Sequence, residues 1–103
     1  MKRQLDIAHV KRMIDVVDAG MAVLATMPTL ADLYENCRAQ DKTARAILNA
    51  LQNEHGATWS AGRGDGYTLR LAGIQSSCTG GPGGLLRNWR NAAKGRLIKE
   101  AAR

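Results

Sequence analysis

Four polar side chains in the middle of the chain are of types that recognise nucleic-acid bases. They are Lys42, Arg45, Asn49 and Gln52. Their spacings of three and four residues place them on one face of a helix. An arginine can donate two hydrogen bonds to guanine, and an asparagine or glutamine can pair with adenine in a similar bidentate way. Thr43 could donate to a phosphate beside the helix N-terminus. An ordinary solvated helix face is the competing interpretation.

Other candidate phosphate contacts lie outside this helix. Arg63 stands between two glycines in a glycine-rich reversal over residues 62–66, and Arg70 follows in the next β-prone segment. An arginine at a flexible tip can enter a minor groove or meet a backbone phosphate. Arg63 could equally well be a solubilising charge on an exposed turn, because the neighbouring Asp65 reduces the local positive potential. Nearer the C-terminus the candidates are Arg87, Arg90 and Lys94.

Two helices are expected to position the central residues. Thr29 can cap the first of them, and a polar turn over residues 38–42 follows it. Asp41 or Thr43 can cap the second, in which apolar residues recur at helical spacing. This second helix, over residues 41–55, should end at Gly56, because glycine suits a left-handed C-terminal cap.

A hairpin is expected after the second helix. Residues 58–61 and 67–71 are short β-prone segments on either side of the glycine-rich reversal. Trp59 and Tyr67 lie where cross-strand packing is expected, which gives both a structural role.

An amphipathic helix is expected upstream. Apolar residues recur every three or four positions from Ile7 to Leu24, and Pro28 should end the helix near Met27. Gly20 interrupts the pattern and could kink or divide the helix. Its spare apolar surface could pack on the C-terminal segment or mediate dimerisation.

The order helix, turn, helix, hairpin resembles the winged helix-turn-helix domain of IclR-type regulators, over roughly residues 7–74. The residues at matching places are Thr29-Leu30, Leu33, Thr43, Arg45, Leu48, Leu51, Gly56, Gly66-Tyr67 and Leu69. The resemblance implies a domain over residues 1–74, mostly α with a small β-hairpin. It also implies a recognition helix over residues 41–55 in the major groove of double-stranded DNA, in a homodimer.

The positive charge is concentrated near the C-terminus. The 103 residues have a formal net charge of +6. Nine basic and eight acidic residues in 1–74 leave a net charge of +1, whereas six basic residues and one acidic residue in 75–103 leave +5. This asymmetry indicates a polyanionic partner or an anionic protein surface.

The basic C-terminal part is expected to be a helix after a flexible connection. Residues 75–84 are rich in serine and glycine and predict a linker, and residues 85–103 predict a basic amphipathic helix. This helix could dock on the domain or on a second subunit, fold on nucleic acid, or bind a protein groove or a membrane surface. In the protein-partner alternative, Leu86 and Trp89 are the anchors.

The sequence offers no enzyme site. His9 and His55 are isolated, and Cys37 and Cys78 have no metal-ligand spacing. No cofactor is expected, and the longest apolar run is too short to cross a membrane. We therefore expect a cytoplasmic DNA-binding protein that acts as a transcriptional regulator. The alternative is a phage or mobile-element protein that binds and modulates a host protein.

Overall fold

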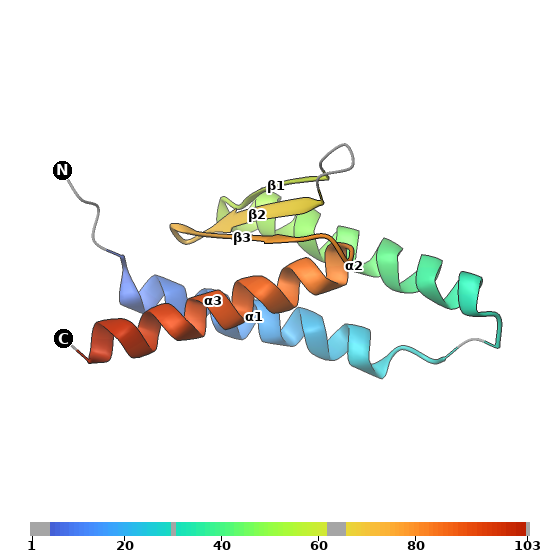
Figure 1. Ribbon diagram of the computed structural model, residues 1–103, viewed down its shortest axis with the longest axis horizontal. Coiled ribbons are helices and arrows are strands. Elements are labelled where there is room, and N and C mark those ends of the chain that lie inside the picture. Colours follow the sequence, from blue (N-terminus) through green and yellow to red (C-terminus); the bar gives the residue numbers. More distant parts are fainter. Residues whose placement is uncertain (1–4, 30, 62–65, 103) are drawn as a thin grey trace.

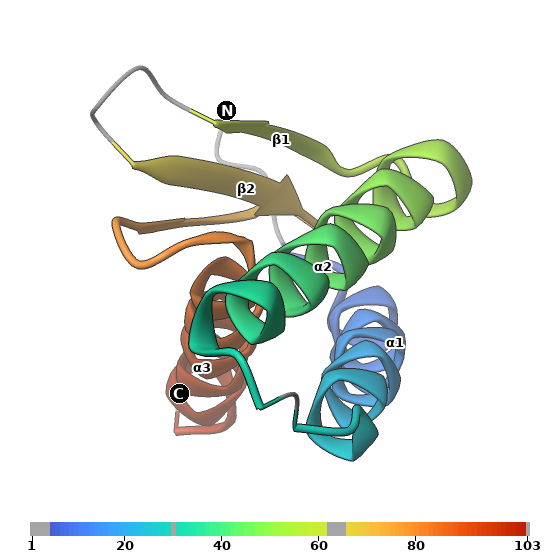
Figure 2. The same ribbon diagram turned by 90° about the vertical axis from the view of Figure 1, so that its right-hand side faces the viewer.

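The computed structural model describes residues 5–29, 31–61 and 66–102 of the chain. In chain order the elements are α1 (Ile7–Thr26), α2 (Leu33–His55), β1 (Thr58–Ala61), β2 (Tyr67–Leu71), β3 (Ile74–Cys78) and α3 (Pro82–Ala101). The three helices occupy the corners of a triangle, and the sheet lies over α3 (Figure 2). The predicted class, mostly α with a small antiparallel β element, is confirmed.

Helix α1 forms as the apolar periodicity predicts. Asp6 caps it by accepting a hydrogen bond from the His9 backbone N–H at 3.1 Å. Its buried residues are Val10, Met13, Ile14 and Val17. Gly20 does not break the helix. A Cβ atom at Gly20 would lie 2.9 Å from a methyl carbon of Ile47, so the glycine allows α1 and α2 to approach closely.

Helix α2 is one continuous element of 23 residues, and the turn predicted over residues 38–42 is wrong. Residues 38–42 include no glycine or proline, and all of them except Asp41 have good helix propensity. Asp32 caps the helix, where Thr29 was expected, and accepts from the Tyr34 backbone N–H at 2.9 Å. The predicted end is confirmed, because Gly56 has a φ of 71° in a left-handed cap.

The three strands form an antiparallel sheet in the order β1-β2-β3. The segment predicted as a linker over residues 75–84 therefore begins inside a strand. Residues 75–78 continue as a strand because a two-residue turn at Ala72 and Gly73 precedes them. The φ values of these two residues, 55° and 79°, match a type I′ hairpin. This turn pairs Leu71 with Ile74 and directs the following polar residues along β2.

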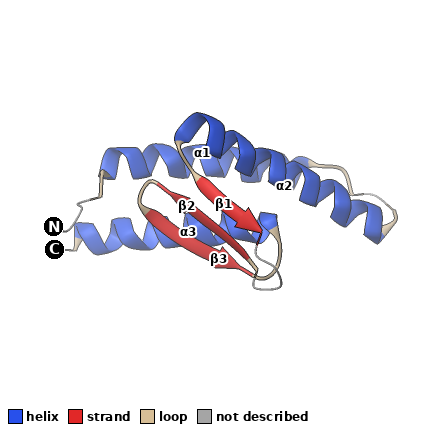
Figure 3. Cartoon of the chain, turned by 90° about the horizontal axis from the view of Figure 1, so that it is seen from above, coloured by secondary structure: helices blue, strands red, loops and turns tan. Residues whose placement is uncertain are grey.

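Helix α3 completes the core. It packs against the sheet, α1 and α2, and its buried residues are Pro82, Leu85, Leu86, Trp89 and Ala93. Pro82 occupies the first turn, where the missing N–H costs no helical hydrogen bond, so the helix begins before the predicted residue 85. The start of α1 and the end of α3 lie at one end of the molecule, and the first turns of α2 project from the other (Figures 1 and 3).

Candidate nucleic-acid interface

Arg45 lies in a corner between α2 and the sheet. Its Nη2 donates to the Tyr67 hydroxyl at 3.1 Å, and its Nε is 3.5 Å from an Asp41 carboxylate oxygen. The guanidinium also lies over the rings of Trp59 and Tyr67, 5.9 and 5.6 Å from their centroids. Such cation–π contacts are favourable, so these neighbours fix the guanidinium in place. The Asp41 carboxylate offsets its charge.

Asn49 is held one turn further along the same helix. Its Oδ1 accepts a hydrogen bond from Nε1 of Trp59 at 3.1 Å. The strand registers explain why these groups meet. Trp59 is opposite Leu69, and Ala61 is opposite Tyr67, so both aromatic side chains belong to the sheet face that Leu69 turns towards the helices. The predicted structural role of Trp59 and Tyr67 therefore extends to orienting Arg45 and Asn49.

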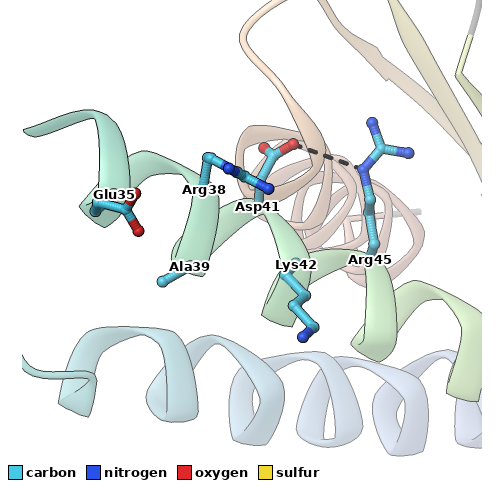
Figure 4. A pocket seen from close by; sticks show the side chains of 6 residues that line it. All are labelled: Glu35, Arg38, Ala39, Asp41, Lys42 and Arg45. Atoms are coloured by element: carbon cyan, nitrogen blue, oxygen red, sulfur yellow. Dashed lines mark ion pairs between the residues drawn. The ribbon is translucent and has the colours of Figure 1, made fainter.

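The predicted recognition face is not a single free surface. Gln52 and Lys42 are exposed and Thr43 is half-buried. Lys42 and Arg45 project to opposite sides of α2, as Figure 4 shows. A base would have to compete with Tyr67 for Arg45 and with Trp59 for Asn49. This competition could not be predicted from the sequence, because Asn49 and Trp59 are ten residues apart and meet only in the folded chain.

An open hollow of about 530 Å³ lies along the first half of α2 (Figure 4). Its lining residues are Glu35, Arg38, Ala39, Asp41, Lys42 and Arg45. Two acidic and three basic side chains are mixed along it. Arg38 stacks over the Tyr34 ring, with 5.8 Å between its guanidinium and the ring centroid. The mixed charge makes this hollow a poor binding site for a uniformly negative DNA backbone.

The exposed side of α3 is the more strongly basic surface. Arg87, Asn91 and Lys94 are exposed at spacings of four and three residues and therefore lie on one side of the helix. The two cationic residues are about 10 Å apart along its axis, at 1.5 Å per residue. Glu100 is the one acidic residue in α3. This side is suited to contact phosphates.

The remaining predicted contacts are dispersed. Arg90 faces α1, where its Nη1 lies 3.4 Å from a carboxylate oxygen of Asp18, so it serves the helix interface. Arg70 is exposed and lines a separate hollow with Arg96 and His9. Arg63 lies outside the described residues.

The two proposed partner anchors are inaccessible. The side chains of Leu86 and Trp89 are both fully buried, with 0% exposure. A protein partner could reach them only if α3 left the core. The sequence pattern of α3 showed an apolar side but could not show that the same chain covers it.

Comparison with protein-family models, curated proteins and solved structures finds no match to this chain. The resemblance to winged helix-turn-helix regulators stays a prediction. Within the described ranges, no helix has the length and apolar character that crossing a membrane requires.

Proposed function

We propose that this chain is a small cytoplasmic protein that binds double-stranded DNA, with α3 as its main phosphate-binding element and transcriptional regulation as its role. The observation that supports the proposal most strongly is the exposed position of Arg87 and Lys94 on one side of α3. The apolar side of α3 faces the core, and the helix packs beside α2. The basic side therefore remains available to a polyanion.

This proposal moves the contact surface away from the predicted recognition helix. Arg45 and Asn49 already have partners within the chain, whereas Arg87 and Lys94 are exposed. Phosphate contacts dominate the affinity of DNA-binding proteins and make it depend steeply on salt. We therefore expect binding that is mainly electrostatic, with any base preference contributed by other exposed side chains such as Gln52.

A salt titration with a matched pair of double variants tests the proposal. The affinity for a random-sequence duplex is measured for the wild type, for Arg87→Gln with Lys94→Gln, and for Lys11→Gln with Arg12→Gln. The last pair removes the same charge from exposed positions on α1. Loss of two phosphate contacts should reduce the slope of log K against log salt by about 2 in the α3 variant alone.

Two results would contradict the proposal. Wild-type protein that does not bind duplex DNA at low salt would exclude it altogether. Equal loss of slope in both double variants would show that net charge matters and that α3 has no special position. A selection of preferred duplex sequences with the wild type would then test the regulatory role, since a regulator must distinguish its site from other DNA.

A further inference from the structure

A hollow of about 420 Å³ lies where α1, the turn between β2 and β3, and α3 meet. Basic side chains from three elements line it, namely His9 on α1, Arg70 on β2 and Arg96 on α3. The turn and Leu5 supply an apolar part of the lining. Leu5 packs closely on the turn, because a Cβ atom at Gly73 would lie 3.3 Å from one of its methyl carbons. The fold therefore gathers three basic groups around one concave site.

The basic groups of this hollow are not neutralised within the described part of the chain. No ion pair joins Arg70 or His9 to a described residue. Arg96 has Glu100 one turn further along α3, but its Nη2 is 3.9 Å from the carboxylate oxygen and its side chain is 46% exposed. Such a pair contributes little, so the guanidinium can turn towards a ligand. Guanidinium and imidazole N–H groups donate hydrogen bonds to phosphate oxygens, and an anion would offset their mutual repulsion.

One carboxylate limits the kind of anion that fits. Asp6 also lines the hollow, and one of its oxygens accepts from the His9 backbone N–H at 3.1 Å. Its negative charge opposes a second phosphate beside the first. A single phosphate attached to an uncharged organic group suits both the arginines and the apolar lining. The volume lies within the range of about 300–1,000 Å³ that is typical of small-molecule sites.

The hollow is separate from the basic side of α3. Arg96 comes nine residues after Arg87, which is a rotation of about 180° beyond two full turns at 3.6 residues per turn. A duplex bound to Arg87 and Lys94 would therefore lie on the opposite side of the helix from the hollow. The ligand of the hollow must be a different molecule.

We propose that this hollow binds the phosphate group of a small phosphate monoester. Arg70 and Arg96 are the main partners of the phosphate oxygens, and the His9 ring is the third donor. The organic part of the ligand rests on Leu5 and on the turn between β2 and β3. The site uses neither Arg87 nor Lys94, so the proposal is independent of DNA binding.

A titration followed in NMR spectra of the backbone amides tests the site. The probe is phenyl phosphate, a monoester with an uncharged organic group, and sodium chloride keeps the ionic strength constant. The resonances of residues 72 and 73 should shift with a dissociation constant of about 1 mM, at the weak end of specific binding. Arg70→Gln and Arg96→Gln should each weaken binding about tenfold, because each removes charged hydrogen bonds. Arg87→Gln removes the same charge from the opposite side of α3 and should leave the affinity unchanged.

A competition experiment distinguishes this ligand from a DNA phosphate. At constant ionic strength, saturating phenyl phosphate should leave the affinity for a random-sequence duplex unchanged, because the two ligands bind on opposite sides of α3. If the chain binds no duplex, the NMR titration alone decides. Circular dichroism of each variant checks the fold, which should be kept because both arginines are exposed.

Three results would overturn the proposal. The first is no shift at residues 72 and 73 up to about 10 mM phenyl phosphate, tenfold above the expected dissociation constant. The second is equal weakening by Arg87→Gln, which would show attraction by net charge alone. The third is displacement of the duplex by phenyl phosphate, which would make the hollow part of the DNA-binding surface.

Discussion

The indole nitrogen of Trp89 donates a hydrogen bond to the carbonyl oxygen of Ile74 at 3.1 Å. The same N–H also points at the carbonyl oxygen of Leu71 at 3.2 Å. These two carbonyls flank the two-residue turn between β2 and β3. The middle of α3 therefore holds the hairpin at the turn, and the largest buried side chain satisfies the polar groups beside it.

Replacing Trp89 by phenylalanine should lower the free energy of unfolding by about 1–3 kcal/mol. The variant removes the indole donor from both carbonyls, which keep the backbone hydrogen bonds of the hairpin, and it leaves unfilled space in the core where a fully buried side chain stood. Trp59→Phe is the matched control. It removes the bond to Asn49, which lies at an exposed site, and should cost less than about 1 kcal/mol. Urea unfolding followed by circular dichroism measures both, and equal losses would contradict the role assigned to Trp89.

Ala72→Gly should stabilise the protein by about 1 kcal/mol. Ala72 has a φ of 55° and is the one non-glycine residue with positive φ in the described ranges. A Cβ atom is disfavoured in that conformation by roughly 1–2 kcal/mol, and part of the gain is lost because glycine is more flexible in the unfolded chain. Ala50→Gly, at an exposed position inside α2, should have the opposite sign. Thermal denaturation of the two variants is sufficient to test the contrast.

Two glycine-to-alanine substitutions should differ in sign. At Gly95, inside α3, a Cβ atom would meet nothing within 4 Å, so alanine should stabilise by about 0.5–1 kcal/mol through helix propensity. At Gly66 the φ is 89° and a Cβ atom would lie 2.7 Å from the Cys78 carbonyl oxygen. Gly66→Ala should therefore lower the midpoint of unfolding. A neutral result at Gly66 would show that the strand end can shift.

Arg45→Ala should weaken the fold more than it changes DNA selection. The guanidinium joins α2 to β1 and β2 through Tyr67 and Trp59, and its loss should cost about 1 kcal/mol at this half-exposed site. We expect the preferred duplex sequence, if the wild type has one, to persist in Arg45→Ala and Asn49→Ala. A changed base preference in a folded variant would restore the predicted recognition role of residues 41–55.

Local chemistry predicted several elements well. The recurrence of apolar residues from Ile7 onward located α1, and glycine chemistry located the end of α2 at Gly56. Both depend on interactions within a few residues. The continuous course of α2 through residues 38–42 was missed because polar residues were interpreted as a turn, although none of them breaks a helix.

The errors around β3 and α3 have a different origin. Gln75, Ser76 and Ser77 have the composition of a linker, and their strand conformation comes from pairing with β2. The pairing of β2 with β3 is also stabilised by Trp89 in α3, whose indole N–H donates to the carbonyl oxygens of Leu71 and Ile74. Trp89 is more than ten residues away from Gln75, Ser76 and Ser77. The sequence could show that Trp89 belongs to an apolar stripe, but the surface that covers the stripe is a property of the tertiary fold.

The position of α3 also affects synthesis of the protein. Every other element precedes α3 in the chain. Helix α3 nevertheless packs against α1, α2 and the sheet, and it supplies Leu85, Leu86 and Trp89 to the core. At translation rates of about 5–20 residues per second, the twenty residues of α3 take roughly 1–4 s to appear. During that interval the parts of α1 and of the sheet that α3 later covers are exposed, although α2 can already pack against α1 and β1. We therefore expect α1 and the sheet to expose apolar surface until α3 has been synthesised and has packed on them.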